Sequence, residues 1–222
     1  MLRPRRGEPT GVGRTEAFSD GVFAVAITLL ALDLARIHAD PPDTTLAQAL
    51  GVEWPTLLAF AASFVFIGVA WTNHHNVFRR VALQTRALNG ANLLVLAGIT
   101  MVPWVTATLA SSLSGTEGGD GGRQEIVLYA IVTGLGAVTW GLLFHVLATN
   151  PDLLTDPSHA DGFKGDRLGS VVGISTTLLA ALIGYFWNPL VAVALFLALP
   201  VFYYVLSDGL ERTTKPRQPA LS

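Results

Sequence analysis

The sequence predicts an all-α membrane protein with six transmembrane helices, and the distribution of charge is the main reason. Of the 222 residues, 51% are hydrophobic and only 14% are charged, whereas soluble domains carry about 25% charged residues. Four stretches of 25, 30, 26 and 40 residues contain no formal charge. Each is longer than the roughly 18 apolar residues that a spanning helix needs. These observations exclude a soluble enzyme and a disordered protein.

The first apolar segment is the shortest one. Residues 1–15 are polar and rich in arginine, and we expect a flexible cytoplasmic arm there. Behind this arm, 12 residues lie between Asp20 and Asp33, and the segment grows to 17 residues if it is counted from Phe18 to Leu34. Such a segment is either a retained first helix or the apolar region of a cleaved signal peptide.

The remaining apolar stretches predict five more helices. The longest stretch is divided by Asn188-Pro189, a turn dipeptide about halfway along it. The expected helices cover residues 55–77, 88–112, 126–148, 168–187 and 190–206. A membrane domain over residues 16–208 is then followed by a cytoplasmic tail at 209–222.

Lysine and arginine residues indicate the orientation. With a cytoplasmic N-terminus, 12 of the 14 basic residues fall in cytoplasmic segments, and only Arg36 and Arg123 lie outside. Both termini are then cytoplasmic. Seven acidic residues gather on the outer side: Asp33, Asp40, Asp43, Glu53, Glu117, Asp120 and Glu125. They either form an acidic mouth that concentrates cations, or collect there only because basic residues are excluded.

An apolar stripe runs along the first helix. Its members, separated alternately by four and three residues, are Phe18, Val22, Val25, Leu29 and Leu32. This spacing suits close packing around an axis or against another copy of the chain. The alternative is an ordinary packed face, on which the hydroxyl of Thr28 bonds its own backbone.

Polar side chains gather at the end of the second helix, where the membrane offers them no water. His74 and His75 point about 100° apart on a helix, so they are poor joint ligands for one metal ion. We expect no metal site and no cofactor. A polar lock with Asn89 or Asn92 of the next helix is the better interpretation.

Other function classes have no support in the sequence. There is no cysteine, no Gly-x-x-x-x-Gly-Lys phosphate loop and no Gly-x-Ser-x-Gly turn, and we expect no enzymatic activity. A net charge of −2 provides no basic surface for nucleic acid. The Thr-Val-Gly-Tyr-Gly filter of familiar potassium channels is also missing.

The sequence nevertheless resembles the transmembrane protein 175 family of potassium channels. The resemblance rests on residues of three helices: Arg14, Phe18, Ser19 and Asp20 at the start of the first, Trp71, His74, His75 and Phe78 at the end of the second, and Asn89 and Pro103 in the third. The first four form an Arg-x-x-x-Phe-Ser-Asp motif that opens a helix. The chain is similar to the prokaryotic form, which has a single six-helix repeat.

This resemblance implies a homotetramer in which the first helix is retained and lines a central pore. When the family's pore positions are counted from Phe18, the narrowest apolar ring falls at Val25. Leu29 and Leu32 then lie outward of it, and Thr28 forms a polar layer. Family members usually carry a bulkier Ile or Leu at the Val25 position, so we expect a looser constriction here. The implied polar network that ties the first helix to the next two contains Arg14, Phe18, Ser19, Asp20, His74 or His75, and Asn89.

The expected function is passive, potassium-selective conduction through apolar rings that gate by dewetting. The expected partners are potassium ions, the lipid bilayer and further copies of the chain. The uncharged stretches predict a multi-pass protein of the cell membrane. The excess of arginine over lysine, with abundant alanine and glycine, indicates a bacterial source, so we expect a bacterial plasma membrane. The alternative is a secondary transporter or proton-coupled cation exchanger in which His74 or His75 titrates.

Overall fold

The fold is built from membrane-length helices. A computed structural model describes residues 11–35, 45–113 and 122–198. Its helices are α1 (Gly11–Leu34), α2 (Leu46–Val52), α3 (Trp54–Phe78), α4 (Arg86–Leu113), α5 (Arg123–Thr149), the 3-10 helix η1 (Pro151–Leu153), α6 (His159–Phe186) and a short apolar helix over Pro189–Ala198. No β-strand occurs in these three ranges, and the predicted all-α class is confirmed.

Five of the helices, α1, α3, α4, α5 and α6, are long and apolar enough to cross a membrane. The ends of α3, α4 and α5 agree closely with the predicted ones, whereas α6 begins at His159 instead of residue 168. The sixth predicted span is helical as far as Ala198, and its remaining residues lie outside the described ranges. The predicted tail at 209–222 also lies outside them.

The first helix is longer than predicted. It begins at Gly11, so residues 11–15, which were expected to belong to a flexible arm, form its first turns. Three charged residues near its start, Arg14, Glu16 and Asp20, interrupt the apolar sequence. For this reason the uncharged stretch was shorter than the helix. Residues 1–10 of the predicted arm are outside the described part of the chain.

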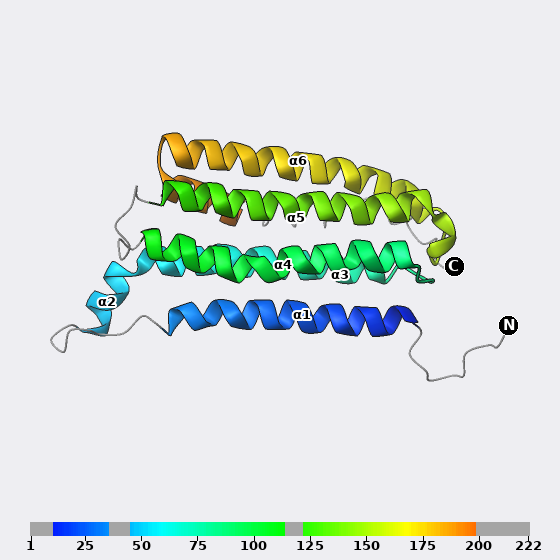
Figure 1. Ribbon diagram of the computed structural model, residues 1–222, viewed down its shortest axis with the longest axis horizontal. Coiled ribbons are helices and arrows are strands. Elements are labelled where there is room, and N and C mark those ends of the chain that lie inside the picture. Colours follow the sequence, from blue (N-terminus) through cyan, green and yellow to red (C-terminus); the bar gives the residue numbers. More distant parts are fainter. Residues whose placement is uncertain (1–10, 36–44, 114–121, 199–222) are drawn as a thin grey trace, which may run out of the picture.

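The long helices lie side by side, with α1 at one edge of the bundle (Figure 1). In the view of Figure 1, α3 and α4 overlap in the middle, and α5 and α6 form the opposite side. The packing follows the same order: α1 contacts α3 and α4, α4 contacts α5, and α5 packs along α6. Within the described residues, α1 therefore packs against α3 and α4 on one side, and its other side is exposed.

Apolar packing beside α1 and backbone hydrogen bonds at one end hold the bundle together. Buried apolar side chains of α1, α3 and α4, among them Phe23, Leu30 and Ile67, form one core cluster. At the end where α4 begins, the backbone N–H of Ala82 donates to Leu153 O at 2.7 Å, and Thr155 N–H donates to Arg80 O at 2.9 Å. These bonds join the α3–α4 turn to the α5–α6 connection, which fixes this end of the bundle.

Candidate functional site

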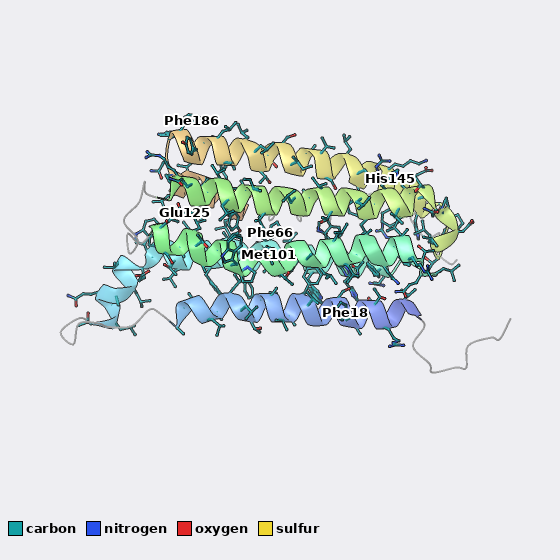
Figure 2. All side chains as sticks on the ribbon, viewed as in Figure 1. Phe18, Phe66, Met101, Glu125, His145 and Phe186 are labelled. Atoms are coloured by element: carbon teal, nitrogen blue, oxygen red, sulfur yellow. The ribbon has the colours of Figure 1, made fainter. Side chains whose placement is uncertain are left out.

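Helix α1 has two distinct faces. The face toward α3 and α4 buries Val12, Ser19, Phe23, Ala26 and Leu30. The opposite face exposes large apolar side chains: Phe18 is 57% exposed, Val25 57%, Leu29 43% and Leu32 63%. Figure 2 shows Phe18 on α1 and Phe186 on α6, at opposite edges of the bundle.

The exposed face contains most of the predicted stripe. Val22 is the exception, because it packs partly against the core cluster of α1, α3 and α4. Thr28 is exposed beside Val25, and its Oγ1 donates to Val25 O at 2.8 Å. The hydroxyl of Thr28 thus bonds the backbone of its own helix, which is one of the two arrangements that the sequence left open.

A buried chain of hydrogen bonds anchors the other face of α1. His74 Nε2 lies 2.8 Å from Asn92 Oδ1, and Asn92 Nδ2 donates to Ser19 Oγ at 3.0 Å. Ser19 Oγ in turn donates to Thr15 O at 2.8 Å. Ser19 and His74 are 0% exposed and Asn92 is 1% exposed. This chain of hydrogen bonds is therefore buried, and it joins α1, α3 and α4. Such bonds hold strongly where no water competes for them.

The direction of this chain follows from its acceptors. Because Asn92 Oδ1 is an acceptor, His74 carries its proton on Nε2 and donates it. Rings surround the imidazole: Phe78 stacks on it at 4.3 Å between centroids, and Phe23 and Trp140 lie at 5.3 and 6.1 Å. His74 is therefore held in one orientation by packing and by its hydrogen bond.

A second connection between α1 and α3 lies nearer the surface. Trp71 Nε1 donates to Asp20 Oδ1 at 2.9 Å, and His75 Nδ1 lies 3.2 Å from Glu16 Oε1. The rings of Trp71 and His75 stack at 6.1 Å. The His75–Glu16 contact becomes an ion pair only when His75 is protonated.

The predicted network residues thus separate into groups. Ser19 and His74 belong to the buried chain, and Asp20 and His75 belong to the surface connection. The buried partner is Asn92 and not Asn89, whose Oδ1 is buried without a hydrogen bond to any described residue.

Two predicted members stand outside both connections. Arg14 is exposed and makes no ion pair or hydrogen bond with residues in the described ranges. Phe18 contributes no polar contact and belongs to the exposed face of α1. Sequence reasoning also missed Thr15, whose carbonyl ends the buried chain, and Glu16.

The sequence contained a signal for Asn92. Leu88, Val95, Leu96 and Ile99 are all buried and lie three, four or seven residues from Asn92. This is the spacing of one helix face, and Asn92 lies near its centre, whereas Asn89, which is also three residues from Asn92, lies at its edge and is only partly buried. The apolar pattern of α4 alone therefore indicates which asparagine points into the bundle.

These features define a polytopic α-helical membrane protein whose first helix is anchored on one face and exposed on the other. The chain belongs to the TMEM175 family: the family model described as "Endosomal/lysosomal potassium channel TMEM175" matches residues 14–103. The matched region contains α3 and most of α1 and α4, and these three helices are the ones that the buried chain of hydrogen bonds joins.

Relatives support this membership. A potassium channel of Streptomyces collinus is 46% identical over 132 residues, which cover 59% of this chain and 64% of that protein. A potassium channel of Chamaesiphon minutus is 46% identical over 107 residues, which cover 48% and 53%. The alignments thus span between half and two thirds of these two relatives.

A solved structure extends the likeness to the whole fold. The crystal structure of a lysosomal potassium-selective channel TMEM175 homolog from Chamaesiphon minutus superposes with a TM-score of 0.72 at 32% identity. The match covers 88% of this chain and 97% of that one. The chain therefore has the TMEM175 channel fold.

Proposed function

We propose that the chain forms a potassium-selective channel that conducts passively, with α1 lining a central pore. The observation that carries the proposal is the exposed apolar face of α1 on a helix whose other face is anchored. In a subunit of membrane-length helices, such a face at the edge of the bundle suits an axis shared by several copies (Figure 1). Relatives that are named as potassium channels support potassium as the conducted ion.

In this proposal Val25, Leu29 and Leu32 form apolar rings, and the narrowest ring is at Val25. Rings of this kind block hydrated ions and gate by dewetting. Thr28 supplies a polar layer between them, since its hydroxyl oxygen keeps lone pairs after donating to Val25 O. Valine is smaller than leucine, so the ring at Val25 is wider than it would be with leucine at the same position.

The assembly and topology belong to the same proposal. Four copies surround the pore, six helices cross the membrane in each copy, and both termini are cytoplasmic. The strong bias of basic residues supports this orientation. Of the predicted outer acidic residues, three lie in described segments: Asp33 near the end of α1, Glu53 at the start of α3 and Glu125 in the first turn of α5. We place the channel in a bacterial plasma membrane.

A proton-coupled exchanger is less well supported by the geometry. His74 is fully buried, donates to Asn92 and is enclosed by rings, which leaves its ring no direct contact with solvent. His75 is more accessible, but it lies against Glu16 on the surface connection.

Planar-bilayer recording of the purified full chain distinguishes the two functions. A channel gives discrete current steps that follow the potassium gradient. Saturable flux that never resolves into steps would favour the exchanger and contradict the proposal. A preparation verified as tetrameric that passes no potassium would contradict it as well.

A further inference from the structure

A cavity of about 440 Å³ lies between α1 and α4, at the end of the bundle where both helices begin. Val25, Leu29 and Leu32 do not line it, nor do Asp20 and Trp71 of the surface connection, but Phe18 of the exposed face of α1 does. Eight residues line it: Gly11, Arg14, Thr15, Phe18, Gln84, Asn89, Asn92 and Leu93. None of these eight is acidic, and Arg14 is the one charged residue among them.

Three polar groups at this cavity lack partners in the described part of the chain. Gln84 Nε2 and Asn89 Oδ1 are buried without a hydrogen bond, and Arg14 has no ion pair there. Buried polar atoms are normally hydrogen-bonded, because an unpaired one loses its hydration without compensation. The lining therefore combines a cation, a neutral donor and a neutral acceptor that a ligand would satisfy.

The chemistry of these groups selects the ligand. A guanidinium pairs best with a phosphate or carboxylate, because its fork of N–H donors matches two oxygens. Gln84 adds a second donor for an anionic oxygen, whereas Asn89 Oδ1 requires a hydroxyl or amine that donates. Phe18 and Leu93, which are 57% and 55% exposed, supply an apolar wall.

We propose that this cavity binds a phosphate ester that carries a neighbouring hydroxyl, of which glycerol phosphate is the simplest. Arg14 and Gln84 donate to the phosphate oxygens, and the hydroxyl donates to Asn89 Oδ1. A cavity of this size lies within the ordinary range for small-ligand sites. The same group occurs in two sources, the headgroup of phosphatidylglycerol and free glycerol 3-phosphate.

Two binding measurements on the full chain separate these sources. Titration of glycerol 3-phosphate into the chain in phosphatidylcholine nanodiscs tests the soluble source. Native mass spectrometry of the detergent-purified chain, mixed with phosphatidylglycerol or phosphatidylcholine, tests the headgroup. Saturable binding of either phosphate probe supports the site, and the probe that binds identifies the source.

Variants show whether the binding occurs in this cavity. Arg14→Gln should weaken binding about tenfold or more, since it removes a charge-assisted contact. Gly11→Leu fills the cavity, because even a Cβ at Gly11 would lie 3.0 Å from Gln84 Oε1. It also places a good helix former in α1, so it remains informative if Arg14→Gln fails to fold.

Arg86→Gln is the matched control, because Arg86 is an exposed cation at the start of α4 that does not line the cavity. It should leave the dissociation constant within about twofold, as expected for surface substitutions. Wild-type binding of neither probe would overturn the proposal. So would unchanged binding in both Gly11→Leu and a folded Arg14→Gln, or an equal loss in Arg86→Gln, which would indicate unspecific charge attraction.

Discussion

Asn92 of α4 donates a hydrogen bond of 3.0 Å to Ser19 of α1, and neither side chain is more than 1% exposed. The same amide accepts from His74 of α3 through its oxygen. One side chain thus joins three helices and holds α1 by the face opposite to Val25. If α1 lines a pore, Asn92 sets the position of the pore wall from inside the subunit.

Asn92→Leu should destabilise the protein by about 1–3 kcal/mol, because it removes the acceptor of His74 Nε2 and the donor to Ser19 Oγ, both of which are buried. Thermal unfolding of the purified chain in detergent measures the loss. Asn89→Leu is the control on the same helix, since its Oδ1 has no hydrogen bond to a described residue. Equal destabilisation by the two substitutions would show that the buried hydrogen bonds of Asn92 make no specific contribution to stability.

Gly184→Ala should destabilise the contact of α6 with its neighbours by about 1–3 kcal/mol through overpacking. A Cβ at Gly184 would lie 2.6 Å from Ala192 Cβ and 2.7 Å from Ile126 Cγ2. Gly169→Ala on the same helix is the control, because a Cβ there meets nothing within 4 Å. It should be neutral or slightly stabilising, since alanine favours helix more than glycine. A comparison of the two melting temperatures decides the point, and an equal change in both would refute close packing at Gly184.

Leu29→Asn should raise potassium conductance or leak, because a polar side chain in an apolar ring favours wetting of the pore. Flux into liposomes of matched protein content measures the effect. Leu178→Asn on α6 is the control, as Leu178 has a comparable exposure of 53% against 43% for Leu29. Flux that rises equally in both variants would point to a general membrane defect and away from a ring at Leu29.

Much of the fold could be predicted because spanning helices must satisfy their own backbone and exclude charge. The uncharged stretches locate α3, α4 and α5, and Asn188 marks the break after α6, where its Oδ1 accepts from Leu190 N–H at 2.8 Å. The first residues of α1 and α6 could not be predicted in this way. Both helices continue into polar turns at Gly11 and His159, which hydropathy cannot distinguish from a loop.

The site was harder to predict than the fold. The motif residues Ser19 and Asp20 both contact α3 or α4, but the motif did not show that they do so through different partners. That division depends on how helices rotate against each other, which local sequence does not determine. Helix α2 was missed for another reason: its seven residues are too short for a periodic signal, although Thr45 and Gln48 form a capping box at its start.

The most direct test of the pore on α1 uses the absence of cysteine from the chain. Val25→Cys introduces a single thiol, and Leu178→Cys provides the same thiol on α6. A charged, membrane-impermeant thiol reagent is applied while potassium current is recorded in a planar bilayer. We predict that the reagent reduces the current of Val25→Cys and leaves those of the unsubstituted chain and Leu178→Cys unchanged. A current through Val25→Cys that persists after mass spectrometry has shown its thiol to be modified would contradict a pore lined by this face of α1.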